Sequence, residues 1–460
     1  MARVAIVGGG IAGLSAAWEL QGAGAEVVVV DAARIGGKLQ ASEVPGLAFP
    51  VDEGADAFLA RVPDALELCA ELGIDDLVHP AARGAWIWSS GRLHPLPQGQ
   101  LLGLPTDVEE IEASGLLSAD GVARLRADLE RDAAPVDADL AIGALVRARL
   151  GDEVCDRLVE PLVGGINGGE ADALSVEACV PQLWACARQG GSLVRAAQAM
   201  RAAGPGSDSP VFATPTAGMA ALPQRLVERL AARPPGLDTV VGRPVTGLST
   251  AAGHRVELSV GGRALDGGPF DGVVLAVPAD VAGALVAGLA PEAAAVLAST
   301  EFASVAMVTV VADRRAIAHP LDGSGFVAAR DAGLDITAAS FASTKWAHWD
   351  DGEHAVFRIS LGHDADPVDW CAKADDELAE VAVRDLGTVL GEPVTPVGVR
   401  VGRWPRAFPQ YRPGHVPRLT EVRAALHAAG PIALAGMSYD GIGVPACVRS
   451  GRIAARHLLA

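Results

Sequence analysis

The chain opens on a glycine-rich turn between a strand and a helix, and this feature constrains its fold more than any other. Residues 4–7 read Val-Ala-Ile-Val and lead directly into the run Gly8-Gly9-Gly10-Ile11-Ala12-Gly13. This spacing is typical of a dinucleotide-binding βαβ unit. The first glycine allows a tight turn, the second lets a pyrophosphate approach the backbone, and the third lets the helix pack closely on the strand. The free N–H groups at the helix N-terminus would face the phosphates.

The second strand of this unit, the valine run 27–30, ends on Asp31. An acid about twenty residues after the glycines accepts hydrogen bonds from the adenosine ribose, and it favours a free 2′-hydroxyl. The ligand expected from the βαβ unit alone is therefore FAD or NAD.

Two segments downstream favour FAD over NAD. Residues 32–38 follow the ribose acid without a break and place Gly36-Gly37 beside Arg34 and Lys38, which suits a second approach to the pyrophosphate. Residues 51–56 then supply a glycine in a polar turn, of the kind whose N–H groups can line a flavin edge. NAD-binding domains rarely carry these additions.

Length and charge exclude several classes of protein. A chain of 460 residues is too long for one core, and half of its residues are hydrophobic, so two or three subdomains are expected. The net charge of −19 argues against binding to nucleic acid or to an anionic membrane surface.

No signal peptide and no apolar run of the ~18 residues that span a bilayer is visible, so a cytoplasmic location is expected. The six cysteines are scattered without metal-ligand spacing, so no metal site is expected.

The patterning predicts an α/β (α+β) fold with three parts. Residues 1–60, 205–280 and 400–460 would form a discontinuous Rossmann-like FAD-binding domain. Residues 61–105 and 281–399 would form a mixed-sheet substrate domain, and 106–204 a helical insertion with 3.6-residue periodicity. The Gly/Pro/Ser/Asp-rich stretch 204–210 is the expected linker, after which strand-like segments at 240–277 would return the chain to the nucleotide sheet.

The C-terminal region carries a second glycine-rich ligand signal. A strand-like run at 431–437 ends near Gly436, and the segment 441–445 reads Gly-Ile-Gly-Val-Pro before a terminal helix that is expected from Ala446. This predicts a second helix N-terminus that faces a ligand.

Taken together, these motifs resemble the oxygen-dependent protoporphyrinogen/coproporphyrinogen oxidase family over nearly the whole chain. Monoamine oxidases and phytoene desaturases share the first and last motifs. The blocks 403–411 and 443–447 are more specific to the porphyrinogen oxidases. The resemblance rests on the segments 8–13, 34–38, 52–58, 93–97, 160–169, 403–411 and 439–447.

The resemblance implies a flavoprotein in which flavin N5 takes hydrides from a porphyrinogen and O2 is reduced to hydrogen peroxide. It requires no catalytic protein residue, and His94, His348 and His415 are expected to be structural. Cys447 matches no covalent-flavin motif, so the FAD is expected to be non-covalent. The residues expected to bind FAD are Gly8, Gly10, Ile11, Ala12, Gly13, Asp31, Ala32, Arg34, Gly36, Gly37, Lys38, Gly54, Ala55, Asp56, Val245, Trp404, Gly436, Gly441, Ile442, Gly443 and Val444.

For the substrate, the resemblance implies a backbone carbonyl near Gly165 that faces the pyrrole N–H groups. Asn167 and Gly168 depart from the family's aromatic and small residues; Asn167 could bond a pyrrole N–H or a propionate, or could simply be a turn residue. Porphyrinogen carboxylates need cations. Arg83 resembles a family arginine that faces the propionates, and Arg61, Lys345 and Arg92 are weaker candidates.

The choice of substrate rests on solubility and on likeness to the oxidases of high-GC Gram-positive bacteria. Coproporphyrinogen III carries four propionates, and an acidic, soluble chain favours it over protoporphyrinogen IX. The resemblance thus implies a place in the coproporphyrin-dependent route to haem, with ferrochelatase contact left open. A flavin amine oxidase or desaturase, and a non-catalytic FAD-binding protein, are the alternatives from other classes.

Overall fold

The computed structural model describes residues 1–82, 84–203 and 210–459 and has the mixed α/β character that the sequence predicts. The predicted linker residues 204–209 and the predicted propionate contact Arg83 lie outside the described residues. Within those ranges, no helix is both long enough and apolar enough to cross a membrane.

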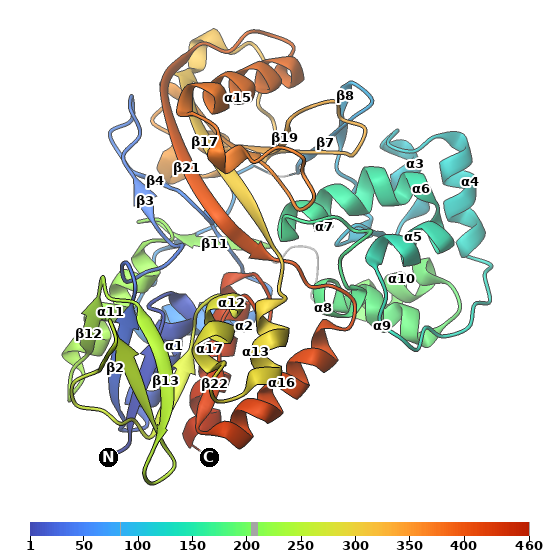
Figure 1. Cartoon of the computed structure of the whole chain (residues 1–460). Helices are drawn as coiled ribbons and strands as arrows, with labels where there is room; N and C mark the ends of the chain where they lie inside the picture. The colour runs from blue at the N-terminus through green and yellow to red at the C-terminus, as the bar shows by residue number, and fades with distance from the viewer. Residues whose placement is uncertain (83, 204–209, 460) are drawn as a thin grey trace.

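A five-stranded parallel sheet carries the N-terminal glycine turn (Figure 1). Four of its strands are buried on both faces, as expected for a parallel sheet covered on each side, whereas the edge strand at residues 238–241 is largely exposed. Its order is β12 (Asp238–Val241), β2 (Glu26–Asp31), β1 (Arg3–Val7), β16 (Gly272–Leu275) and β22 (Ile432–Leu434).

Helices cover both faces of this sheet, and the alternating side chains of β1 divide between the two cores. Val4 and Ile6 pack toward α1 (Ile11–Gly22), α2 (Pro63–Leu72), α11 (Ala221–Ala232) and α17 (Val444–Leu459). Ala5 and Val7 pack toward the opposite side, which is formed by α12 (Ala279–Val286), α13 (Pro291–Ala298) and α16 (His415–Ala429).

One sequence-based expectation is only partly met in this region. Of the segments at 240–277, β12 and β16 join the parallel sheet, but β13 (Val245–Ala251), β14 (Arg255–Val260) and β15 (Arg263–Ala264) form an antiparallel sheet of their own. The physical reason is visible in β14, whose residues alternate between buried and half-buried. Such alternation suits a sheet with one covered face rather than a doubly covered parallel strand.

A seven-stranded mixed sheet stands above the parallel sheet in Figure 1, and α15 (Asp375–Leu390) packs on it. All of its pairings are antiparallel except that of β18 with β7. The order is β21 (Pro396–Pro409), β17 (Phe302–Asp313), β20 (His354–Leu361), β19 (Ile336–Phe341), β18 (Gly325–Ala328), β7 (Trp86–Ser89) and β8 (Arg92–Pro95).

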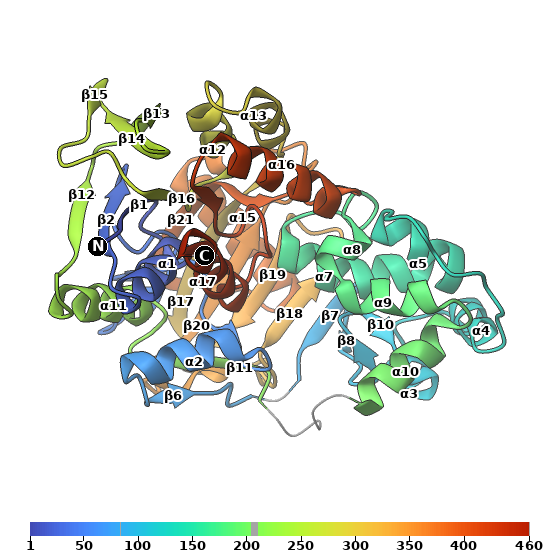
Figure 2. The ribbon, with the colours of Figure 1, turned by 90° about the horizontal axis from the view of Figure 1, so that it is seen from below.

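The stretch that the sequence predicts to be helical forms a separate cluster with its own buried core (Figures 1 and 2). Its elements are α3 (Val108–Ala113), α4 (Ala119–Asp128), α5 (Ile142–Leu150), α6 (Asp152–Val154), a π-helical turn (Cys155–Val159), α7 (Glu160–Asn167), α8 (Val176–Cys179), α9 (Pro181–Gln189) and α10 (Leu193–Ala203). The division of the chain into three domains at the expected boundaries stays a prediction.

Short elements complete the fold. They are β3 (Ala41–Ser42), β4 (Val51–Asp52), β5 (Phe58–Leu59), β6 (Leu77–Val78), β9 (Gln100–Leu101), β10 (Leu104–Pro105), β11 (Phe212–Pro215), α14 (Ala342–Lys345) and 3₁₀ turns at Arg314–Ala316, Ala347–Trp349 and Trp370–Ala372.

Candidate functional site

One large cavity brings together the glycine-rich segments from both ends of the chain. Its volume is about 1530 Å³, which exceeds the ~300–1,000 Å³ typical of a site for one small molecule. The predicted site residues that line it are Gly8, Gly10, Ile11, Ala12, Asp31, Ala32, Gly36, Gly37, Lys38, Gly54, Ala55, Gly165, Asn167, Val245, Trp404, Gly436, Gly441, Ile442, Gly443 and Val444. The cavity therefore has room for a dinucleotide and a second ligand.

The glycines of the first turn differ in what surrounds them. A Cβ on Gly8, whose φ is +108°, would lie 2.3 Å from the carbonyl oxygen of Ala276, and a Cβ on Gly13 would lie 2.0 Å from that of Gly8. Both positions are thus closed by the protein itself. A Cβ on Gly10 would meet nothing nearer than the Gly37 Cα at 4.0 Å. Gly10 is also the N-cap of α1, so the open space lies at the helix N-terminus, where an anion is stabilised.

Asp31 is held rigidly beside this turn. One carboxylate oxygen accepts from the N–H of Gly9 at 2.7 Å, and the other accepts from Ala33 and Arg34 at 2.8 and 2.9 Å. A carboxylate offers about four lone-pair sites. Asp31 therefore keeps capacity to accept from a ribose hydroxyl, in a cavity that it lines.

The second glycine pair lies against the first. The Gly36 N–H donates to the Gly9 carbonyl at 2.8 Å, which docks the loop onto the turn. Lys38 follows, and its Nζ donates to the Ala407 carbonyl and lies 3.1 Å from the Met437 sulfur. Lys38 lines the cavity, and desolvation there lowers its pKa to about 8. Over the described residues, Gly13 and Arg34 are not part of the cavity lining.

Gly54 and Trp404 close one side of the cavity together. The Trp404 indole N–H donates to the Glu53 carbonyl at 3.2 Å, and a Cβ on Gly54 would lie 3.7 Å from the Trp404 ring. That Cβ would also lie 2.8 Å from the Lys38 carbonyl oxygen, so glycine is required by the close approach of two backbone segments.

The structure places Asp56 and Lys345 against each other rather than in the cavity wall. The Lys345 Nζ lies 3.0 Å from the Asp56 carboxylate, which also accepts from the Trp346 indole at 3.0 Å. Arg358 approaches the same carboxylate at 3.4 Å. Burial alone would raise the Asp56 pKa, but the Lys345 and Arg358 charges hold it well below its usual range. Asp56, predicted to bind FAD, and Lys345, predicted to bind substrate, therefore form an ion pair with each other.

The C-terminal glycine segment lines the same cavity. Gly436, Gly441 and Gly443 line the cavity just before α17 begins at Val444. The Tyr411 hydroxyl fixes this segment, because it donates to the Met437 carbonyl and accepts from the Gly441 N–H at 3.0 Å. Cys447 also lines the cavity, and burial raises the pKa of its thiol to about 12, so the thiol stays protonated.

Helix α7 lines the same cavity from the helical cluster. Gly165 and Ile166 are exposed to the cavity, and a Cβ on Gly165 would meet nothing within 4 Å. Asn167 is only 4% exposed, and its side-chain amide donates to the Val163 carbonyl at 2.8 Å. The structure thus gives Asn167 a bond within its own helix, whereas Gly165 faces open space.

The remaining sequence candidates lie elsewhere. Arg61 is exposed, and within the described ranges it is not part of the cavity lining. Arg92 donates to His94 and to the Gly115 carbonyl, and His94 is 4% exposed. The His415 ring lies 3.1 Å from the Tyr439 carbonyl, and burial lowers its pKa.

Sequence reasoning missed several charged and polar residues of the cavity, since they belong to no motif. Among them, Arg330 comes from the connection after β18, Glu160 begins α7, and His363 and Asp366 follow β20. Only the pairing of distant strands and helices brings these residues to one wall.

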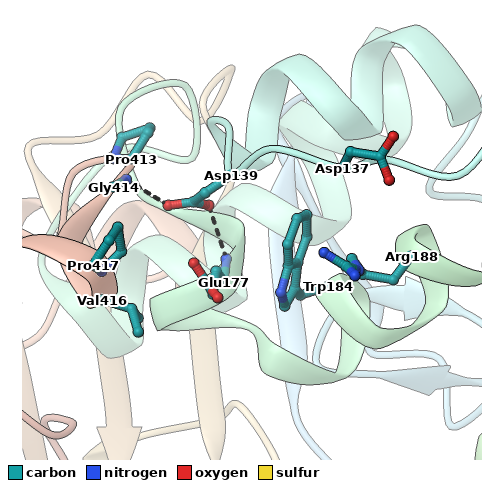
Figure 3. Close-up of a pocket in the computed structure, with 9 residues that line it drawn as sticks. All are labelled: Asp137, Asp139, Glu177, Trp184, Arg188, Pro413, Gly414, Val416 and Pro417. Carbon is teal, nitrogen blue, oxygen red and sulfur yellow. Dashed lines mark hydrogen bonds between the residues drawn. The ribbon is translucent and has the colours of Figure 1, made fainter. Parts of the chain in front are cut away.

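A second, shallower pocket of about 560 Å³ lies between the helical cluster and the start of α16 (Figure 3). Asp139 organises it by accepting from the N–H groups of Gly414 and Glu177 at 2.7 and 3.1 Å. The Arg188 guanidinium lies 5.5 Å from the centre of the Trp184 ring. None of the glycine-rich motif segments contributes to this pocket, as far as the described residues go.

Comparison with known proteins gives concordant matches. The family model described as flavin containing amine oxidoreductase matches residues 11–459. The Mycobacterium tuberculosis H37Rv protein named coproporphyrinogen III oxidase is 37% identical over 96% of this chain and 94% of its own length. The Bacillus subtilis protein of the same name is 31% identical over 98% and 97%. A crystal structure from Exiguobacterium, provisionally named a protoporphyrinogen oxidase, has a TM-score of 0.86 at 29% identity over 99% and 98% of the two chains.

Proposed function

Because the chain belongs to the flavin-containing amine oxidoreductase family, we propose that it oxidises coproporphyrinogen III to coproporphyrin III with O2 as the electron acceptor. Its membership makes it an oxidoreductase, and relatives that match nearly its full length are named coproporphyrinogen III oxidases. The observation that carries the proposal is the single cavity of about 1530 Å³ that joins the dinucleotide turns to the open face of α7.

The residues of the cavity fit FAD as the cofactor. Gly10 leaves open space at the α1 N-terminus for a pyrophosphate, and Asp31 retains capacity to accept from a ribose hydroxyl. A bound flavin supplies the redox chemistry, accepting hydride from the substrate and passing electrons to O2. The protonated Cys447 thiol offers no nucleophile for a covalent link, so we propose non-covalent binding.

The overall reaction balances as three two-electron steps. Each step removes two hydrogen atoms from the porphyrinogen and reduces one O2 to one H2O2, so that six hydrogen atoms leave in total. The chain's contribution is to hold the macrocycle between α7 and the flavin site and to exclude water from it. No step requires a protein nucleophile.

We propose coproporphyrinogen III rather than protoporphyrinogen IX as the physiological substrate, with the enzyme acting in the cytoplasm on the coproporphyrin-dependent route to haem. The net charge of −19 disfavours residence on an anionic membrane surface. The product would pass to a ferrochelatase by transient contact.

The amine oxidase alternative predicts an aromatic cage in the cavity. The aromatic residues that line the described part of the cavity are Phe58, Phe212, Phe302, Phe408, Trp370 and Trp404, and the chain's two tyrosines, Tyr411 and Tyr439, are not among them. Tyr439 instead donates its hydroxyl to the Val277 carbonyl at 2.9 Å.

Anaerobic mixing tests the reaction directly. The FAD-loaded protein, mixed with coproporphyrinogen III under nitrogen, is expected to lose its oxidised-flavin absorbance near 450 nm as porphyrin appears, roughly one flavin per two electrons. A non-catalytic FAD-binding protein would keep its flavin oxidised, and that result would remove the proposed function. A primary amine is mixed with the FAD-loaded protein in the same way, and reduction of the flavin by the amine would support the amine oxidase alternative.

A further inference from the structure

Arg330 lines the large cavity from the connection that follows β18. Strands β18 and β19 pack against α7, the helix whose Gly165 face opens into the same cavity, and Figure 2 shows α7 beside these strands. Arg330 therefore lies on the part of the cavity that is proposed to hold the tetrapyrrole.

The Arg330 guanidinium has carboxylates around it but no short bond to any of them. Its Nη2 lies 3.4 Å from Glu160 and 3.5 Å from Asp172, and its Nε lies 3.8 Å from Asp156. Charge-assisted N–H···O bonds are normally about 2.7–2.9 Å long. Nη1 takes part in none of these contacts, and the side chain is 40% exposed.

Each of these carboxylates already has a nearer donor. Arg147 approaches Asp156 at 2.6 Å and Asp172 at 3.0 Å, and the Ala171 N–H donates to Glu160 at 2.7 Å. The acids therefore position Arg330 through charge without occupying its N–H groups in short bonds.

The other basic side chains of the cavity are engaged more closely. Among the described lining residues, Lys38 bonds the Ala407 carbonyl, Arg406 lies 2.8 Å from Asp280, and Arg449 lies 3.1 Å from Asp64. Among the lysines and arginines that line the described part of the cavity, Arg330 is therefore the one that can bind a new anion without breaking a short bond.

We infer that Arg330 binds a carboxylate of the tetrapyrrole substrate, an inference that rests on the proposed function. The planar guanidinium presents paired N–H donors that match a carboxylate, which a lysine cannot reproduce. Glu160, Asp156 and Asp172 hold the guanidinium at the cavity wall through Nη2 and Nε. The N–H groups that make no short bond, those of Nη1 above all, meet the propionate there. Arg330 is accordingly a substrate-binding residue that no glycine motif predicts.

The test compares a ligand that carries four carboxylates with the same macrocycle in which all four are methyl esters and uncharged. Coproporphyrin III and its tetramethyl ester, both added from dimethyl sulfoxide, are titrated into the FAD-loaded protein, and binding is followed by porphyrin fluorescence. Arg330→Gln is expected to raise the Kd for coproporphyrin III about tenfold or more and to leave the Kd for the ester unchanged. Arg330→Lys is expected to restore part of the affinity, since it keeps the charge and loses the paired geometry.

Arg126→Gln is the matched control, because Arg126 is similarly exposed, pairs with Glu112 in the same helical cluster and does not line the cavity. Equal weakening of acid and ester by Arg330→Gln, or no weakening of either, would overturn the inference; Arg330 would then only brace α7. If Arg330→Gln fails to fold, Arg330→Lys decides alone: unchanged affinity for coproporphyrin III counts against a paired contact. Wild-type turnover of coproporphyrinogen III is measured first. If the wild type turns over coproporphyrinogen III while the Arg330 variants bind coproporphyrin III as tightly as the wild type does, this inference fails and the proposed function stands.

Discussion

At the residue scale, the glycines of the N-terminal motif divide into those that shape the fold and those that leave room for a ligand. A Cβ on Gly8 or Gly13 would lie only 2.3 or 2.0 Å from a backbone oxygen, so a side chain there would force the turn and α1 apart. Gly10 and Gly165 face open space instead. A side chain at either of these two positions tests ligand binding without disturbing the protein core.

Gly10→Val is expected to remove FAD while the apoprotein still folds. The Gly10 backbone, at φ −75° and ψ 178°, suits a β-branched residue, so only the pyrophosphate space is filled. We expect a loss of FAD affinity of roughly 100-fold or more, a change of about 3 kcal/mol, and a far-UV circular dichroism spectrum like that of the wild-type apoprotein.

The control for Gly10→Val is Gly288→Val, a position with nothing within 4 Å that does not line the cavity. It should retain the wild-type ratio of flavin to protein. A Gly10→Val protein with a full complement of FAD would contradict the placement of the pyrophosphate.

Gly165→Leu should separate substrate binding from cofactor binding. Leucine is about 0.5–1 kcal/mol better than glycine inside a helix, so the melting temperature should not fall. Flavin content should be unchanged, while kcat/KM for coproporphyrinogen III should drop about tenfold or more because the side chain enters the cavity. Gly165→Ala should lower kcat/KM less than Gly165→Leu does. Equal kcat/KM for the wild type and both variants would rule out substrate binding at this face of α7.

At the element scale, β4 illustrates a buried charge that the fold tolerates at a cost. Asp52 is 2% exposed and accepts from the Met219 N–H with both carboxylate oxygens, at 3.0 and 3.1 Å, which ties β4 to the segment before α11. Desolvation raises the Asp52 pKa to about 6, against the lowering effect of the Met219 bond and the Arg358 charge. The folded state therefore holds this proton more tightly than the unfolded chain does.

Because its pKa is raised, Asp52 makes the folded protein less stable as the pH rises. The stability that Asp52 contributes is present below about pH 4 and is lost as pH rises through about 6, because the charged carboxylate is then buried. Asp52→Asn removes this titration. Relative to wild type, its free energy of unfolding should rise by about 1–3 kcal/mol between about pH 4 and pH 7. Urea unfolding of both proteins at the two pH values measures this, and a difference that does not change with pH would exclude Asp52 as the titrating group.

Also at this scale, the sequence predicted elements whose signal is local. The glycine turn with its flanking strands and the helix-rich stretch after 106 were predictable from periodicity and turn chemistry. The separate sheet of β13–β15 could not be predicted, because the residue pattern of a strand does not show which other strand it pairs with. The Asp56–Lys345 pair was also missed, since its two residues are joined only by tertiary packing.

At the scale of the whole molecule, the site exists only because distant parts of the chain meet. The cavity draws on residues from Val7 to Arg449, including the two glycine segments, α7 and the mixed sheet. The glycines and the acid in the part of this cavity that is proposed to hold FAD are recognisable in the sequence, because their function depends on local spacing. The part that is proposed to hold the substrate, with Arg330 beside α7, depends on the relative placement of the helical cluster and the sheet, which no local pattern encodes.

Aerobic turnover of the FAD-loaded protein with coproporphyrinogen III and protoporphyrinogen IX, assayed in parallel, is the most direct test of the proposed function. Porphyrin fluorescence and hydrogen peroxide are followed together, and non-enzymatic oxidation is subtracted. We expect a higher kcat/KM for coproporphyrinogen III, with one H2O2 formed per pair of electrons removed. A preference for protoporphyrinogen IX would reverse the choice of substrate. The absence of porphyrin above the non-enzymatic rate with either compound would contradict the proposed function itself.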